Sequence, residues 1–211
     1  MEKKNVVVFG GGPHSKVVLD LMLHSKEFDV VGVVDNIDEA PFGVPVLGKD
    51  DDMDAVKAMG VQNAFVAIGN NRIREMVSEK VITAGLELVT VIAEDAIVSE
   101  YSDIGKGVLI NHGVIVNAGV SIGKGTILNT GCTVDHDCVI GQYCHIAPGT
   151  HISGSTSVGD NSFLGTGTSV IDRIVIGKNV MVGAGAAVVR DLPDNCTATG
   201  VPARIKRINE E

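Results

Sequence analysis

One short stretch of the chain concentrates side chains that can move protons. Residues 133–138 read TVDHDC, and two further histidines, His145 and His151, follow it. An imidazole titrates near neutral pH, so His136 is suited to take a proton from a nucleophile. The neighbouring carboxylate of Asp137 can hold the ring in one tautomer. A hydrated histidine at a surface turn is the alternative interpretation of His136.

A second group of residues suits the binding of phosphate. An apolar run, residues 5–9, ends in Gly10, Gly11 and Gly12, and a helical pattern that opens near His14 follows. The first turn of a helix offers free backbone N–H groups to phosphate oxygens. The dinucleotide fingerprint G-x-G-x-x-G is absent, which disfavours NAD and favours a nucleotide with a shorter pyrophosphate arm. A tight turn without a ligand is the alternative.

Polar residues also follow the next two apolar runs. Asp35 and Asn36 come after the second run, and Gly69, Asn70 and Asn71 come after the third. Ligands of open parallel sheets bind beyond the carboxyl ends of the strands. The three strand ends together therefore predict a nucleotide site, in which the Asp35 carboxylate can accept hydrogen bonds from a ribose or a base.

Strands and helices alternate in the first 93 residues, which predicts a small parallel Rossmann-like sheet. We expect strands at 5–9, 30–34, 64–68 and 86–92, helices at 14–23, 51–59 and 71–84, and loop and turn at 41–48.

The rest of the chain repeats every six residues. From Val98 to Val188 every sixth residue is Ile, Leu or Val, sixteen in all, and no insertion breaks the series. A period of six fits neither an α-helix nor a flat strand, and it indicates short strands that stack in successive turns. Glycine often follows the aliphatic residue, where we expect it to free the backbone for the bend. A small residue precedes the aliphatic one by two positions, as at Cys132, Cys138 and Cys144. Burial in the interior is favoured for these three cysteines over a metal or disulfide role.

Composition narrows the classes of function. The chain has 211 residues, 45% of them hydrophobic, and a net charge of −9. Because the chain has only 17 basic residues against 26 acidic ones, a nucleic-acid partner is not expected. We find no signal peptide or membrane span, and the cysteine usage suits a reducing compartment, so we expect a cytoplasmic protein.

The order of the motifs resembles a known family. VVVFGGGPHSKVVLD opens the chain, Asp35-Asn36 ends the second strand, and AIGNNRIR ends the third, ahead of an uninterrupted hexapeptide repeat. This layout is similar to the nucleotide-sugar acetyltransferases that include the bacillosamine- and perosamine-pathway N-acetyltransferases and the sialic-acid O-acetyltransferases. The family loop often reads GAGGH or GASGH, and here Pro13 precedes the histidine. The resemblance implies a nucleotide-sugar-binding domain, 1–93, followed by a left-handed parallel β-helix, 94–211, with three hexads per coil.

The same resemblance implies roles for individual residues. His136 matches the general base, Asp137 its orienting partner, and Gly154, one coil of eighteen residues later, the donor to an oxyanion. Acetyl-CoA is the implied co-substrate and no metal is expected. The residues implied at the acetyl-CoA site are His145, Gly154, Gly165, Gly183 and Arg204. Lys206 and Arg207 can also meet its phosphates, with solvated basic side chains as the alternative.

The expected activity is N-acetylation of a nucleotide-linked amino sugar in the synthesis of a surface glycan or glycoprotein sugar. UDP and a 4-amino sugar are favoured, because the short loop and Asp35-Asn36 resemble the bacillosamine group most. The resemblance also implies a homotrimer with sites between subunits. Three alternatives stay open: a sialic-acid-type O-acetyltransferase, a γ-carbonic-anhydrase-like zinc enzyme and a non-catalytic nucleotide-sugar-binding protein. Zinc would draw on His112, His136, His145 and His151.

Overall fold

The computed structural model describes residues 3–49 and 53–208 and divides into two compact units. The first unit is Met1–Val91 and the second is Ile92–Glu211. No helix within the described ranges has both the length and the apolar character needed to cross a bilayer.

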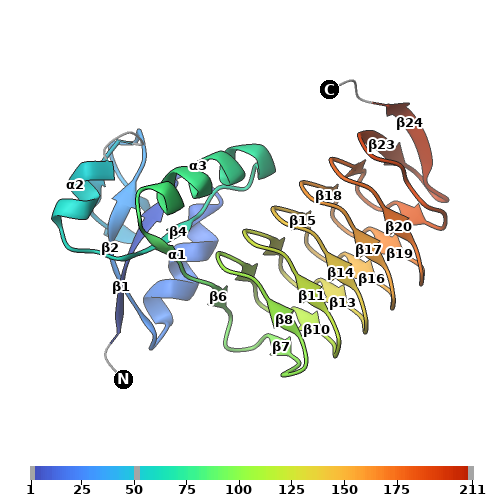
Figure 1. Cartoon of the computed structure of the whole chain (residues 1–211), viewed down its shortest axis with the longest axis horizontal. Helices are drawn as coiled ribbons and strands as arrows, with labels where there is room; N and C mark the ends of the chain where they lie inside the picture. Colours follow the sequence, from blue (N-terminus) through green and yellow to red (C-terminus); the bar gives the residue numbers. More distant parts are fainter. Residues whose placement is uncertain (1–2, 50–52, 209–211) are drawn as a thin grey trace. The chain divides into compact units, whose positions relative to one another are not determined.

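The first unit is built on a five-stranded parallel sheet (Figure 1). Its strand order is β3-β2-β1-β4-β5. Val7 and Phe9 of the central strand pack in one core cluster with residues of α2 and α3, and Val6 and Val8 are fully buried on the opposite face. The elements are β1 (Lys4–Phe9), α1 (Ser15–His24), β2 (Phe28–Val34), the 3₁₀ turn η1 (Pro41–Gly43), β3 (Val46–Gly48), α2 (Met53–Ala58), β4 (Asn63–Val66), α3 (Asn71–Thr83) and β5 (Glu87–Leu88).

This strand order places the switch point between β1 and β4. The chain winds outward from β1 to β2 and β3, then crosses to β4 and β5 on the other side. Open α/β sheets bind ligands at this point, beyond the carboxyl ends of the strands. The loops that leave it here are Gly10–Gly12 and Gly69–Asn71.

Two expectations for this unit were wrong in detail. Residues 41–48 were expected to be loop and turn, but they include the edge strand β3, whose Val46 pairs with Val33. Residues 86–92 were expected to form one strand. They form β5 and then β6 (Val91–Ile92), which belongs to a different sheet, of eight strands. Short edge strands carry too few residues to show an alternating pattern. The start of the expected helix 51–59 lies outside the described residues.

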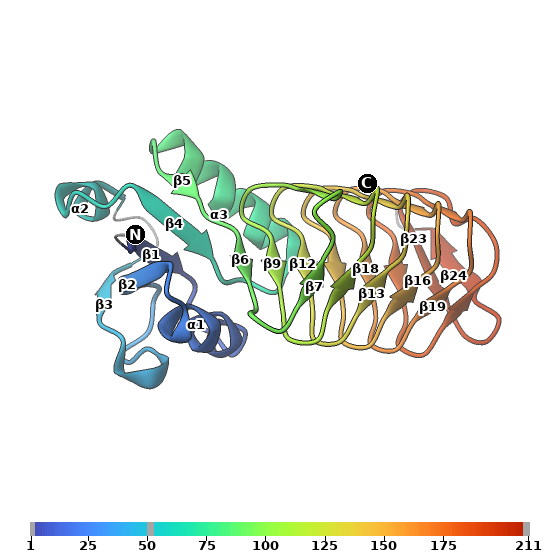
Figure 2. The same ribbon diagram turned by 90° about the horizontal axis from the view of Figure 1, so that it is seen from below.

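The second unit is a parallel β-helix with three faces (Figure 2). The six-stranded face runs β22-β19-β16-β13-β10-β7, the five-stranded face β20-β17-β14-β11-β8, and the eight-stranded face β24-β23-β21-β18-β15-β12-β9-β6. The two-residue strands are β7 (Ile97–Val98), β8 (Asp103–Ile104), β9 (Leu109–Ile110), β10 (Ile115–Val116), β11 (Ser121–Ile122), β12 (Ile127–Leu128), β13 (Thr133–Val134), β14 (Val139–Ile140), β15 (His145–Ile146), β16 (His151–Ile152), β17 (Ser157–Val158), β18 (Phe163–Leu164), β19 (Ser169–Val170), β20 (Val175–Ile176), β21 (Met181–Val182) and β22 (Ala187–Val188). β23 (Cys196–Thr199) and β24 (Arg204–Ile208) end the eight-stranded face, β24 being antiparallel.

The register confirms three hexads per coil. From β7 to β22, paired strand residues are eighteen positions apart, as Thr133 and His151 are, and the step is sixteen between β21 and β23. The aliphatic residue of every hexad is the second residue of its strand and points into a shared core. Cys132, Cys138 and Cys144 lie in this core, fully buried and free, as expected.

The expected role of the glycine after each aliphatic residue was wrong. The left-handed backbone lies three residues after the aliphatic position, where Gly119 has a φ of 74° and Asp137 one of 59°. The glycine directly after the aliphatic position serves close packing between coils. A Cβ on Gly123 would lie 2.5 Å from the backbone carbon of Gly141, one coil on. A side chain at Gly123 would therefore collide with the backbone of the next coil.

Candidate functional site

The imidazole of His136 is fixed at the corner between the six-stranded and five-stranded faces. Its Nδ1 lies 2.9 Å from Asp137 Oδ2, and its backbone N–H donates to Asp135 Oδ1 at 2.8 Å. The His136 side chain is 59% exposed, so a ligand in solvent can reach it. With the carboxylate of Asp137 accepting from Nδ1–H, Nε2 keeps the lone pair that a general base needs.

The preceding coil supports the two carboxylates of this corner. Asn117 Nδ2 donates to Asp135 Oδ1 at 2.8 Å. A Cβ on Gly119 would lie 2.6 Å from Asp137 Oδ1, so the carboxylate occupies the space that this glycine leaves open. Asp135, Asn117 and Gly119 were not among the site residues expected from the sequence. Asn117 and Gly119 lie eighteen residues, or one coil, before Asp135 and Asp137. The repeat spacing alone would therefore have placed them beside these two carboxylates.

Gly154 lies directly against the ring of His136, as the eighteen-residue spacing predicts. A Cβ at this glycine would come within 2.6 Å of both Cε1 and Nε2 of the imidazole. Its N–H donates to no acceptor among the described residues, while its carbonyl accepts from Arg173 at 3.0 Å. The corner therefore brings together an imidazole, a carboxylate hydrogen-bonded to it and a backbone N–H that has no acceptor among the described residues.

The charges at this corner favour the protonated ring. The pKa of His136 is raised above its usual value, first by the hydrogen bond to Asp137 and then by the charge of Asp135. The pKa of Asp135 is lowered, mainly by the backbone N–H of His136 and then by the amide of Asn117. A more basic imidazole is a stronger proton acceptor once it has been deprotonated.

His145 lies elsewhere on the β-helix. It opens β15 on the eight-stranded face, half a coil away from His136, and is 9% exposed. Its Nε2 lies 3.1 Å from Asn129 Nδ2, and its ring meets Phe163 edge to face at 5.2 Å between centroids. The two histidines of one chain therefore do not meet.

The other residues implied at the acetyl-CoA site, Gly165, Gly183 and Arg204, make contacts within the β-helix itself. A Cβ on Gly165 would lie 2.6 Å from the backbone nitrogen of Ala184, and one on Gly183 would lie 2.7 Å from Thr199. Close packing of coils accounts for both glycines. Arg204 is exposed in β24, where its guanidinium donates to the carbonyl of Ala203.

In the first unit, Asp35 ties the end of β2 to the glycine loop. Its Oδ2 accepts from the Gly11 N–H at 2.5 Å, and its Oδ1 accepts from the Asn36 N–H at 2.6 Å. A Cβ on Gly11 would collide with Ile37, which explains that glycine. Gly10 has a φ of 103° and its N–H donates to Val34. Asp35 therefore organises the loop, a role that the sequence analysis did not foresee.

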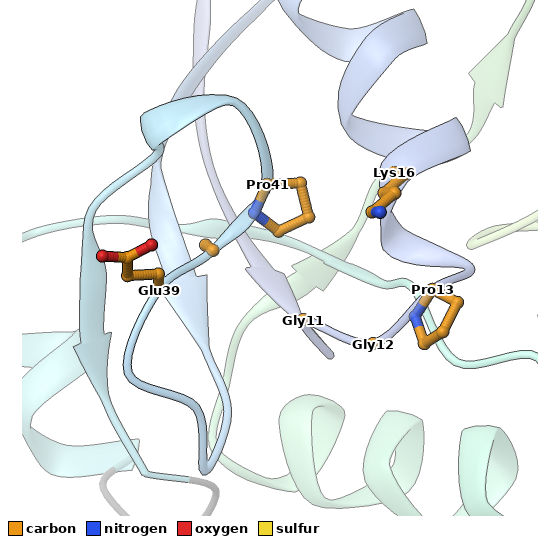
Figure 3. Close-up of a pocket in the computed structure, with 7 residues that line it drawn as sticks. Gly11, Gly12, Pro13, Lys16, Glu39 and Pro41 are labelled. Atoms are coloured by element: carbon orange, nitrogen blue, oxygen red, sulfur yellow. The ribbon is translucent and has the colours of Figure 1, made fainter.

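Two hollows flank this loop. The first, of about 330 Å³, lies between the glycine loop and the segment after β2, with Lys16 of α1 and Glu39 on opposite sides of it (Figure 3). The second, of about 390 Å³, is bounded by residues 35–38 and 46–49. The predicted Gly11 and Gly12 line the first, and Asp35 and Asn36 line the second. A lysine beside a helix N-terminus suits phosphate.

The third strand end is held together by an arginine that sequence analysis missed. Arg74 is 1% exposed and donates to the carbonyls of Ile68 and Gly69 and to Asn71 Oδ1. A Cβ on Gly69 would lie 3.8 Å from His14, so this loop and the glycine loop are neighbours. Burial, and then the charge of Arg74, lower the pKa of His14 to about 4.

Asn70 has a clear structural role beside this loop. It caps α3, because its side chain accepts from the backbone N–H of Ile73 at 3.1 Å. An asparagine at this position satisfies one of the N–H groups that the first turn of a helix leaves open.

The histidines considered for zinc lie at different places on the β-helix. His112 pairs with Asp95 at 2.6 Å, and His151 lies on the six-stranded face beside Thr133. Within the part of the chain that the structure describes, no three His, Cys, Asp or Glu side chains gather as metal ligands.

Comparison with known sequences identifies both units. Residues 5–81 match the PglD N-terminal domain, and residues 119–154 and 155–190 match the bacterial transferase hexapeptide (six repeats). A serine acetyltransferase of Synechococcus elongatus is 43% identical over 49 residues, 23% of this chain and 20% of that protein. A galactoside O-acetyltransferase of Lactococcus lactis is 46% identical over 48 residues, 23% of each. The chain thus matches about a fifth of the length of these two curated relatives.

Solved structures match almost the whole chain. PerB of Caulobacter crescentus, in complex with CoA and GDP-perosamine, is 44% identical with a TM-score of 0.93, over 96% of this chain and 97% of that one. The acetyltransferase domain of PglB from Neisseria gonorrhoeae, in complex with acetyl coenzyme A, is 35% identical with a TM-score of 0.92, over 97% and 100%.

The parallel β-helix and its hexapeptide match define a left-handed β-helix acyltransferase of the hexapeptide class. With a PglD-type domain ahead of the repeats and matches along its full length, the chain belongs to the hexapeptide-repeat sugar acetyltransferases that use acetyl-CoA.

Proposed function

We propose that this acetyltransferase moves the acetyl group of acetyl-CoA to the amino group of a nucleotide-linked amino sugar. The observation that carries the proposal is the corner at which His136 contacts both Asp137 and Gly154. Two findings support it. The N-terminal unit has hollows at its strand ends, and the PerB relative binds CoA together with GDP-perosamine.

The corner supplies the groups that such a transfer requires. The amine nitrogen attacks the thioester carbonyl while Nε2 of His136 takes an amine proton. The Gly154 N–H is our candidate donor to the oxyanion of the tetrahedral intermediate. When that intermediate collapses, the carbon–sulfur bond breaks, and the imidazolium returns its proton to the departing thiolate of CoA. Asp137 holds the ring and stabilises its charged form.

The nucleotide is the finer part of the proposal. The short glycine loop and Asp35-Asn36 favour a UDP-linked 4-amino sugar, whereas the PerB relative, 44% identical, is in complex with GDP-perosamine. We propose a nucleoside-diphosphate amino sugar bound at the strand ends, with Lys16 near its phosphates, and retain uridine as the prediction to test. Four free cysteines suit the cytoplasm as the site of this reaction.

A panel assay tests this proposal. Purified protein is given acetyl-CoA with UDP- and GDP-linked amino sugars, and with the matching sugars that carry a hydroxyl in place of the amine. We expect CoA release and an N-acetyl product with one nucleotide series only. Turnover of the hydroxyl sugars alone would instead establish an O-acetyltransferase. Binding of sugar nucleotides without any CoA release would make the chain a non-catalytic binding protein.

We further propose a homotrimer in which each site draws on two chains. His136 and His145 lie half a coil apart on one chain, at a corner and on a different face. If both serve one acetyl transfer, the second histidine must come from another copy.

A further inference from the structure

A chain of side-chain amides runs along one corner of the β-helix and ends on His145. Asn111 and Asn129 lie one coil apart, between the eight-stranded and six-stranded faces. Asn111 Nδ2 donates to Asn129 Oδ1 at 3.1 Å and to Thr130 Oγ1 at 2.9 Å. Asn129 Nδ2 in turn lies 3.1 Å from His145 Nε2. Asn111 is 1% exposed, so this chain is anchored in a buried amide.

Backbone groups fix the direction of both amides. The Oδ1 of Asn111 lies 2.7 Å from the backbone N–H of His112, and the Oδ1 of Asn129 lies 2.8 Å from that of Thr130. A backbone N–H can only donate, so the oxygen of each amide must face it. The NH₂ of Asn129 therefore faces the imidazole, and a donor meets His145 Nε2.

We infer that Asn129 holds His145 in the tautomer that carries its proton on Nδ1. A neutral imidazole has one donor and one acceptor nitrogen, and here Nε2 must be the acceptor. The ring cannot turn over easily to exchange the two nitrogens, because it meets Phe163 edge to face, at 83° between planes, and is nearly buried. Asn129 acts as a positioning residue, and Asn111 keeps its amide from rotating.

This tautomer places the proton of the neutral His145 ring on Nδ1. The inference rests only on the hydrogen bonds described above, so it can be tested separately from the proposed function.

Nitrogen NMR of the ligand-free protein tests the tautomer directly. Protein labelled with ¹⁵N-histidine is recorded at a pH at which His145 is neutral, and its signals are assigned by their loss in His145→Gln. We expect a protonated Nδ1 and an unprotonated Nε2. A wild-type spectrum with the proton of His145 on Nε2 would overturn the inference by itself, whatever the variants do and whether or not the enzyme acetylates sugars.

Isosteric variants then test the role of Asn129. Asn129→Asp replaces the donor that faces Nε2 by an acceptor, so the proton should move to Nε2 or occupy both nitrogens. The matched control is Asn179→Asp, because Asn179 Nδ2 donates to Asn195 Oδ1 at 2.9 Å in an amide pair that does not contact His145. The control should keep the wild-type pattern. An Asn129→Asp spectrum identical to wild type, in a protein that unfolds normally, would also contradict the inference.

Discussion

At the scale of single residues, the proposed chemistry depends on the ring of His136. It contacts Asp137 through Nδ1, lies against Gly154 and remains open to solvent. Few tertiary contacts bury it, so removing the imidazole changes chemistry more than packing. Mutations at this corner therefore report on mechanism with little disturbance of the fold.

His136→Ala should leave both substrates bound and lower kcat by about 10²–10⁴-fold, the usual contribution of a general base. The measurement is steady-state CoA release, with calorimetric titration of each ligand. His24→Ala is the matched control, since His24 is an exposed histidine at the end of α1. Turnover near wild type in His136→Ala at neutral pH would remove this residue from the mechanism.

Asp137→Asn should shift the acidic limb of the kcat/KM profile to lower pH. The hydrogen bond to Asp137 is the largest cause of the raised pKa of His136, so a neutral amide there lets the imidazole lose its proton at lower pH. Maximal kcat should fall less than in His136→Ala. An acidic limb that stays in place, in a variant whose activity is otherwise measurable, would argue that another group titrates in the profile.

At the scale of an element, the glycine loop is held in place by the hydrogen bond from Gly11 to Asp35, which follows β2. Asp35→Ala removes the carboxylate that accepts from Gly11 and Asn36. Binding of the sugar nucleotide should weaken by about 1.5–3 kcal/mol, the worth of charge-assisted hydrogen bonds, while acetyl-CoA affinity hardly changes. Titration calorimetry compares it with Asp29→Ala, which changes an exposed aspartate near the start of β2. Equal losses for both ligands would contradict separate sites.

The junction of the glycine loop with α1 should make the stability of the protein depend on pH. In the folded chain the pKa of His14 is about 4, against 6.5 for a free side chain. As the pH falls below 6.5, His14 becomes protonated in the unfolded chain but stays neutral in the folded chain. The free energy of unfolding therefore decreases until about pH 4, where the folded chain is protonated as well. The full difference corresponds to roughly 3 kcal/mol.

Urea denaturation between pH 7 and 4 checks this dependence. His14→Gln keeps a polar side chain but cannot titrate, so its unfolding free energy should fall less steeply over the same range. Parallel slopes for the wild type and His14→Gln would show that His14 does not carry the effect.

At the scale of the whole molecule, the prediction concerns assembly. Light scattering should give the mass of three chains. Co-expression of His136→Ala and His145→Ala chains should restore activity, because in random trimers about one shared site in four receives both native histidines. Each variant alone stays impaired and serves as the control. A monomer, or a mixture no more active than its parts, would show that sites are not shared.

The sequence by itself determined the hexapeptide repeat, the strands of the β-helix and the contact between neighbouring coils at His136. A period of six from Val98 to Val188 predicts every strand from β7 to β22, and a step of eighteen residues places Gly154 against His136. These predictions succeed because each coil contacts only its neighbours, so distance along the sequence translates directly into distance in space. The strand ends of the first unit follow from local pattern in the same way.

Only the tertiary structure shows the contacts between side chains that lie far apart in the sequence. Burial of Arg74 beneath the Gly69 loop, the pKa of His14 and the hold of Asp35 on Gly11 all arise where separate strands end side by side. The missed strand β3 forms only because β2 offers it an edge. Asn111 and Asn129 are eighteen residues apart, and Asn129 and His145 are sixteen apart. The direction of their hydrogen bonds is fixed by backbone N–H groups. A sequence shows the spacing of such groups, but only the folded backbone sets which atom faces which.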